Sequence, residues 1–209
     1  MPQSIFTKKE ERFLKLLNEA GVDYIIVGLS AAALQGAPVV TQDIDLWFKD
    51  LANPKIATIA RKVGATYIPS FGLNPPMFAG ADLELFDIVP TLSGLQDYET
   101  EAKQAMTIEL GEIEIKVLHL SQIIKSKKAA NRDKDKIVLP VLQDSLLAIE
   151  KKRRIKLQQD QSLYEKVRLV DLNLPTRHCE QKQTYQQASG LSYESKPNSL
   201  ELPTQILGP

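Results

Sequence analysis

Residues 24–48 constrain the fold more than any other part of the sequence. They comprise a short apolar segment, a glycine, an alanine-rich segment and an acidic segment, in that order. Residues 24–27 are aromatic and β-branched, which predicts a buried strand. Gly28 permits a tight turn, and residues 30–35 predict a short helix. Residues 43–48 predict a second strand. We therefore expect an α/β fold with a small mixed sheet flanked by helices.

Two aspartates lie on the second predicted strand. Side chains alternate between faces along a strand, so Asp43 and Asp45 share one face while Ile44 points into the core. A rise of roughly 3.3 Å per residue separates the two carboxylates by about 6–7 Å. At that separation both can bind one divalent cation. Because an Asp-x-Asp pair also occurs by chance in many strands and loops, its surroundings decide its meaning.

Backbone groups beside this pair are suited to bind phosphate. A helix that begins just after a glycine offers free N–H groups to an anion, and Gly28 permits a close approach. The Ser30 hydroxyl either donates to that anion or caps the start of the helix.

A third carboxylate near the pair would complete the site. Asp87 lies on another predicted strand, residues 83–89, and it would either bind a metal ion with the pair or accept the proton of an attacking hydroxyl. The alternatives are that Asp87 is a surface acid at the end of its strand, and that Glu84 supplies the third carboxylate.

Hydrophobic periodicity, capping residues and turn residues predict the remaining elements. The helices are expected at residues 7–20, 54–63, 121–130 and 133–154, and the other strands at residues 66–69, 107–110 and 113–117. Residues 71–80 are rich in Gly and Pro, which predicts a loop. Ser121 is the expected cap of the helix at residues 121–130, and Pro140 predicts a kink or a break in the helix at residues 133–154.

Composition favours one soluble domain with an appendage. The 209 residues are 43% apolar and carry a formal net charge of zero, so no overall field favours nucleic acid or an anionic membrane as a partner. The single cysteine, Cys179, excludes a disulfide framework. Neither a membrane span nor a signal peptide is evident, so a cytoplasmic protein is expected. Residues 1–154 are predicted to form the domain, and residues 155–209 a tail, partly helical and then disordered.

The acidic strand and its surroundings resemble the signature of the DNA polymerase beta-type nucleotidyltransferase superfamily. In that signature a hydrophobic residue, Gly, and Gly or Ser precede an Asp-hydrophobic-Asp pair, as in residues 27–36 and 41–46. The sequence is most similar to a small prokaryotic branch that includes AbiEii-type toxins and minimal nucleotidyltransferases. Residues 86–90 resemble the strand with the branch's third carboxylate, and residues 128–135 resemble its later Lys…Arg-x-Lys-Asp segment. The resemblance covers about residues 10–150.

This resemblance implies a nucleotidyltransferase fold and the Mg²⁺-dependent transfer of a nucleoside monophosphate from an NTP such as ATP to a hydroxyl. The acceptor would be RNA (including tRNA), a protein or a small molecule, and a partner protein would fit a toxin–antitoxin-like system. The implied catalytic residues and metal ligands are Asp43, Asp45 and Asp87, and the implied NTP-binding residues are Gly28, Ser30, Arg132 and Lys134.

Two positions depart from the pattern of the branch. Leu29 stands where a second small residue is expected, which leaves Ser30 to serve in its place. Val39 stands where the branch often has Arg. The acidic set is intact, but these departures favour an alternative, a catalytically impaired protein of the same fold that binds nucleotide or a partner.

Basic residues crowd the segment 125–154. Lys127, Lys128, Arg132 and Lys134 would neutralise a triphosphate or a nucleic-acid backbone. For Lys127 and Lys128 a solvated helix face is an equally good interpretation. A further alternative is therefore an RNA-binding module in this segment, whose affinity would fall steeply with salt.

Overall fold

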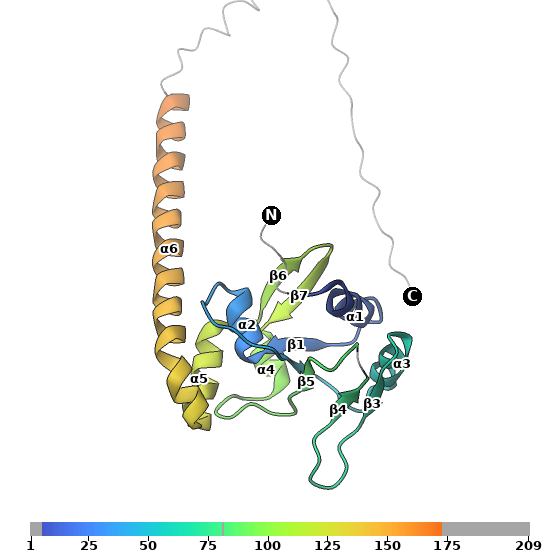
Figure 1. Ribbon diagram of the computed structural model, residues 1–209. Coiled ribbons are helices and arrows are strands. Elements are labelled where there is room, and N and C mark those ends of the chain that lie inside the picture. The colour runs from blue at the N-terminus through green and yellow to red at the C-terminus, as the bar shows by residue number, and fades with distance from the viewer. Residues whose placement is uncertain (1–5, 81, 173–209) are drawn as a thin grey trace, which may run out of the picture. The chain divides into compact units, whose positions relative to one another are not determined.

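The structure, a computed structural model, describes residues 6–80 and 82–172 (Figure 1). The chain divides into two units, Met1–Lys156 and Leu157–Pro209, and the sheet and cavities described below belong to the first. The predicted disorder beyond residue 172 lies outside the described residues. Within the described residues, no helix combines the length and the apolar character that crossing a membrane requires.

A five-stranded mixed sheet forms the centre of the first unit (Figure 1). In spatial order its strands are β5 (Phe86–Ile88), β2 (Ile44–Phe48), β1 (Tyr24–Val27), β7 (Ile113–Val117) and β6 (Met106–Leu110). β1 is antiparallel to β2 and parallel to β7, whereas β2 and β5 are parallel. β6 and β7 form an antiparallel hairpin. The predicted small mixed sheet is confirmed, and so is the predicted hairpin.

Helices flank this sheet, as the sequence predicts. They are α1 (Lys8–Glu19), α2 (Gly28–Leu34), α3 (Pro54–Lys62), α4 (Tyr98–Ala102), α5 (Leu120–Ala130) and α6 (Asp133–Leu172). Before α1, the Thr7 hydroxyl accepts a hydrogen bond from the Glu10 N–H, and the Glu10 carboxylate accepts one from the Thr7 N–H. This reciprocal cap explains where α1 begins. The mixed α/β fold class is therefore confirmed.

Aromatic side chains join the helices to the sheets. Phe13 of α1 packs edge-to-face against Phe78 and Phe86, with ring centroids 5.3 and 5.0 Å apart. On β2, the buried Trp47 packs edge-to-face against Tyr98 of α4, with centroids 5.5 Å apart. Trp47 is thus a residue of the hydrophobic core, although it lies close to the acidic residues in the sequence.

The predicted loop at residues 71–80 is partly wrong. Within it, β4 (Met77–Ala79) pairs antiparallel with β3 (Thr66–Ile68) in a separate two-stranded sheet. Phe78 is buried, and its contact with the core supports a strand in a segment that Gly and Pro otherwise interrupt.

The predicted strand at residues 83–89 is shorter than expected. Only the three residues of β5 lie opposite β2 in register. The Phe86 N–H donates to the Leu83 carbonyl at 3.0 Å, so the residues before β5 form a turn. Leu83 is nevertheless fully buried. The apolar residues between 83 and 89 therefore predicted burial correctly, but they overestimated the length of the strand.

The last two helices differ from the prediction at three points. The cap of α5 is His119, whose ring accepts a hydrogen bond from the Ser121 N–H at 3.2 Å, so Ser121 lies inside the helix. α6 passes through Pro140 without a break and extends beyond residue 154. Pro140 and Lys136 are exposed, so water can replace the bond that the Lys136 carbonyl loses.

Candidate functional site

Three aspartates come together on neighbouring strands. β2 and β5 pair so that Asp45 lies directly opposite Asp87. Asp43 is exposed and immediately precedes β2. All three line one cavity of about 430 Å³, together with Gly28. The structure thus brings the three predicted carboxylates into one site, which we call the aspartate cavity.

Backbone hydrogen bonds and buried side chains fix the register of this pair of strands. The Ile44 N–H donates to the Leu85 carbonyl at 2.7 Å, and the Val89 N–H donates to the Leu46 carbonyl at 2.9 Å. Ile44 and Leu46 are buried on either side of Asp45 in the sequence. A slip of one residue would expose these apolar side chains and bury the acid, so the hydrophobic pattern specifies the register.

Gly28 leaves room for the Asp45 carboxylate. β1 pairs with β2 so that Val27 lies opposite Asp45, and the next residue, Gly28, has a φ of +67°. A Cβ atom at Gly28 would lie 1.8 Å from the Asp45 Oδ2 atom, far inside van der Waals contact. A close approach to Gly28 was expected from the sequence, but the neighbour that approaches is a carboxylate of the site itself.

We expect Gly28→Ala to destabilise the fold more than Gly21→Ala. Gly21 also has a positive φ, +65°, but a Cβ atom there would meet nothing within 4 Å. Positive φ alone costs an L-residue about 1–2 kcal/mol, so Gly21→Ala measures that cost. The clash with Asp45 should add at least about 1 kcal/mol at position 28. Urea denaturation of both variants gives the difference, and equal losses would rule out the contact.

The acids of the aspartate cavity repel one another. Burial, followed by the charges of Asp87 and Asp43, raises the pKa of Asp45 to about 6. Burial and then the charge of Asp43 raise the pKa of Asp87 above its ordinary value. Lys127 and Lys134 oppose the shift at Asp45, and Lys134 also opposes the shift at Asp87. A bound cation would relieve this repulsion.

The donor set fits a divalent cation by its chemistry. Carboxylate oxygens are the ligands that Mg²⁺ prefers, and Asp43, Asp45 and Asp87 supply them around one cavity. Among the residues that the structure describes, no three acidic, histidine or cysteine side chains are already gathered as a formed metal centre.

Asp45→Asn is expected to stabilise the metal-free protein at neutral and alkaline pH. Because the folded state holds the Asp45 proton more tightly than the unfolded chain, stability is lost as the pH rises from 3.8 through about 6. The substitution removes this loss and should gain about 1–2 kcal/mol at pH 8, allowing for partial exposure. Thermal unfolding in EDTA at pH 4 and pH 8 measures the gain, with the exposed Asp144→Asn as control. A gain of the same size at both pH values would contradict this origin.

Three cationic side chains line the same cavity as the aspartates. They are Lys127, Arg132 and Lys134. The carboxylate of Asp135, which is fully buried, accepts hydrogen bonds from Lys127 Nζ at 2.8 Å and from Arg132 Nε at 2.7 Å. Burial alone would raise the pKa of Asp135, but these hydrogen bonds lower it below its ordinary value. Lys127, whose role the sequence left open, is therefore a residue of the cavity wall.

Two polar contacts join the start of α5 to the end of α2. The Gln35 side chain, just after α2, donates to the Leu118 carbonyl at 2.9 Å and accepts from the Leu120 N–H at 2.8 Å. At its other end α5 finishes at Asn131, which adopts the left-handed conformation with φ of 50°. This turn leads directly into α6, so both helices contribute residues to the cavity.

Ser30 does not line the aspartate cavity. Its hydroxyl donates to the Val27 carbonyl at 3.0 Å, and its side chain is buried. Neither Ser30 nor Glu84 is among the described residues that line the aspartate cavity. A local structural role for Ser30, which the sequence left open, agrees with this hydrogen bond.

Thr91 and Ser93 line the aspartate cavity and were not predicted. They lie in the segment after β5, and the signal available in the sequence was their position directly downstream of Asp87. Gly94 allows this segment to approach α5, because a Cβ atom there would lie 2.4 Å from the Cβ of Ala129. Such hydroxyls can donate to phosphate oxygens.

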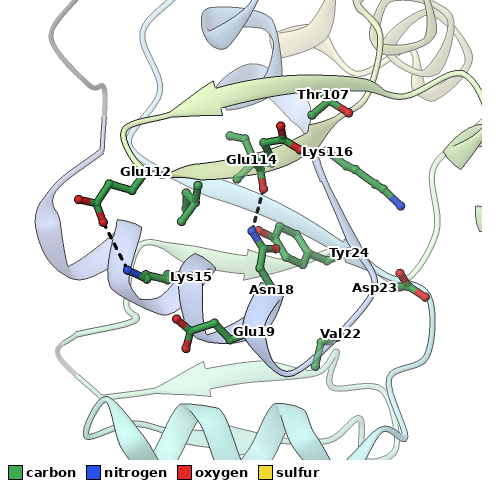
Figure 2. Close-up of a pocket in the computed structure, with 13 residues that line it drawn as sticks. Lys15, Asn18, Glu19, Val22, Asp23, Tyr24, Thr107, Glu112, Glu114 and Lys116 are labelled. Atoms are coloured by element: carbon green, nitrogen blue, oxygen red, sulfur yellow. Dashed lines mark hydrogen bonds and ion pairs between the residues drawn. The ribbon is translucent and has the colours of Figure 1, made fainter.

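Another cavity, of about 560 Å³, is lined by α1 and the β6–β7 hairpin (Figure 2). Several of its polar groups contact one another. Lys15 Nζ lies 3.5 Å from the Glu112 carboxylate, and the Asn18 amide donates to the Glu114 carbonyl at 2.7 Å. Its described lining residues include none of the predicted site residues. The aspartate cavity is therefore the candidate functional site.

Comparison with known proteins gives structural neighbours only. No protein-family model and no curated protein matches the chain. The solution structure of the antibiotic-resistance factor ANT(2'')-Ia aligns with a TM-score of 0.47 at 17% identity, over 77% of this chain and 95% of that one. The crystal structure of ANT(2'')-Ia in complex with adenylyl-2''-tobramycin gives 0.48 at 18% identity, over 72% and 95%. An antigenic nucleotidyltransferase-like protein from Paracoccidioides brasiliensis gives 0.36 at 16% identity, over 74% and 92%.

Proposed function

We propose that this protein is a nucleotidyltransferase, which transfers a nucleoside monophosphate from an NTP to a hydroxyl group. One observation carries the proposal, namely that the three aspartates share a cavity with three cationic side chains. Carboxylates suit a divalent cation, and lysine and arginine suit a polyphosphate. The two sets together suit a triphosphate that carries a divalent cation.

Each group of residues has a distinct role in this proposal. Asp43, Asp45 and Asp87 would hold Mg²⁺, which when bound supplies positive charge to the reacting phosphate and to the leaving pyrophosphate. Lys127 and Lys134 would balance the remaining charge of the triphosphate. Arg132 would add its paired N–H donors to the same task.

The reaction is a displacement at the α-phosphorus. The acceptor hydroxyl oxygen forms a bond to that phosphorus, while the bond from the phosphorus to the oxygen that bridges to the β-phosphate breaks. Pyrophosphate leaves with the electron pair of the broken bond, and the hydroxyl proton passes to a carboxylate. We assign this proton to Asp87, which lies directly opposite Asp45 on the neighbouring strand β5.

The assignment to one branch of the superfamily, and the partner that this branch implies, depend on the sequence resemblance. Residues 86–90 and 128–135 support the AbiEii-type branch, and with it a toxin–antitoxin-like partner. A cytoplasmic location and a catalytic domain within residues 1–154 are part of the same proposal.

Calorimetric titration of the full chain with each of the four NTPs tests the proposal. At least one NTP should bind in the presence of Mg²⁺, and EDTA should weaken that binding at least about tenfold, since the cation bridges acids and phosphates. Failure of every NTP to bind would refute the proposal.

A second candidate function is nucleotide binding without transfer. Leu29 lines the aspartate cavity, so the departure from the small-residue pattern falls in the site itself. NTP binding with no transfer of label from any α-³²P-labelled NTP, to RNA, protein or small molecules, would favour this candidate.

A further inference from the structure

A third cavity, of about 570 Å³, adjoins the aspartate cavity and shares Thr41 and Asp43 with it. The start of α1, the helix α2 and the segment that joins α2 to β2 contribute to its wall. Cavities of this size accommodate small organic ligands. We call it the adjoining cavity.

The two cavities differ in their cationic side chains. Lys127, Arg132 and Lys134 line the aspartate cavity. No lysine or arginine is present among the described residues that line the adjoining cavity, where the ionisable side chains are Asp43 and Glu10. A nucleic-acid backbone would meet carboxylates there and no cation. An uncharged or cationic ligand, by contrast, would meet a neutral or favourable potential.

Apolar side chains form much of the remaining wall of the adjoining cavity. They include Ala33, Val39 and Leu85. The segment that carries Val39 is held in place, because the Val39 N–H donates to the Ala37 carbonyl at 2.8 Å and the Ala37 N–H donates to the Ala32 carbonyl at 3.1 Å. These hydrogen bonds fix the segment that carries Val39, and the apolar side chains of the wall favour a ligand with an apolar part.

We propose that the adjoining cavity binds the acceptor, and that the acceptor is a small hydroxyl compound that is uncharged or cationic. This inference rests on the proposed nucleotidyl transfer. Because Thr41 and Asp43 line both cavities, an acceptor in one and an NTP in the other meet at these residues. Charge then assigns each substrate to its cavity, since the triphosphate binds among cations and the acceptor does not.

The charge preference of the adjoining cavity can be measured directly. In a Cys179→Ser background, Ala33→Cys places a thiol in the cavity, and Ser70→Cys places one on an exposed residue outside it as a control. Each full-length variant is treated with a cationic trimethylammonium-ethyl and an anionic sulfonato-ethyl methanethiosulfonate. The ratio of cationic to anionic reaction rates should be at least about fivefold higher at position 33 than at position 70.

Two results of this experiment would overturn the proposal. One is a rate ratio at position 33 that equals or falls below the ratio at position 70. The other is failure of both reagents to react at position 33, which would mean that the cavity is closed to ligands. Val39→Arg in the Ala33→Cys background should lower the ratio, whereas the matched Val39→Leu should leave it unchanged.

A nucleotide-binding measurement separates this proposal from the proposed function. Modification at position 33 should change the affinity for NTP with Mg²⁺ less than about twofold if the two subsites are distinct, and a larger loss would refute separate subsites. Labelling of total tRNA by the wild-type protein and any α-³²P-labelled NTP would also overturn the acceptor class. If no NTP binds, the transferase proposal fails, while the rate ratio still reports the charge preference of the cavity.

Discussion

Asp43→Asn combined with Asp45→Asn will lower the rate of nucleotidyl transfer at least about 1,000-fold, which corresponds to about 4 kcal/mol of transition-state stabilisation. Both side chains line the aspartate cavity with Asp87. Asparagine keeps the shape of each side chain but removes two of the three negative charges that would hold the cation. The fold should survive, because the change removes a half-buried charge at position 45, whose pKa is raised by burial and then by the charges of Asp87 and Asp43.

A second double variant controls for the loss of two carboxylates as such. Asp50 accepts a hydrogen bond from the Ala52 N–H at 2.8 Å in a turn, and Asp144 is exposed on α6. Asp50→Asn with Asp144→Asn should therefore transfer label from an α-³²P-labelled NTP nearly as fast as the wild type. Thermal unfolding establishes that both variants are folded. If the Asp43 and Asp45 double variant retains wild-type transfer, the proposed chemistry is wrong.

The acidic strand was predictable because its information is local. Ile44 and Leu46 alternate with Asp45, and alternation alone assigns the faces of a strand. The pairing of Asp45 with Asp87 was not predictable in the same way. It depends on the parallel contact of β2 with β5, which joins segments that are distant in the sequence and leaves no pattern within either one.

At Gly28 the sequence predicts a close approach but not the group that makes it. The residue type predicted a close approach to the backbone, and the structure contains one, 1.8 Å from a hypothetical Cβ to the Asp45 Oδ2. The identity of the neighbour depends on the antiparallel register of β1 and β2, which places Val27 opposite Asp45. The sequence therefore predicted that a neighbouring group approaches Gly28 closely. The pairing of β1 with β2 determines that this group is the Asp45 carboxylate.

Phe78 accounts for the strand that the sequence missed. Composition around it is typical of a loop, because Gly and Pro interrupt the segment. Its ring, however, is buried against Phe13 and stabilises β4 through a contact with α1. Gly and Pro limit the length of such a strand, but they do not indicate that a residue within it packs against a distant part of the chain, as Phe78 packs against Phe13.

Asp135→Asn is expected to destabilise the protein by about 3 kcal/mol, because it leaves the cationic partners of a buried carboxylate unpaired. The Asp135 side chain is 1% exposed and pairs with Lys127, which is 13% exposed, and with Arg132. Lys127 lies on α5 and Asp135 on α6, so the basic segment alone did not reveal which lysine is held. Loss of this anchor should also weaken NTP binding, since Lys127 lines the aspartate cavity.

Asp133→Asn provides a matched control for this change, in the same first turn of α6. Asp133 is 96% exposed and forms an ion pair with Lys136, so its loss should cost less than about 0.5 kcal/mol. The favourable contribution of an acid near a helix N-terminus is removed in both variants. Urea denaturation at pH 7 compares them. Because hydrogen bonds lower the pKa of Asp135, the difference should shrink as the pH falls through that lowered value. Equal stability of the two variants at pH 7 would show that the buried carboxylate does not anchor Lys127.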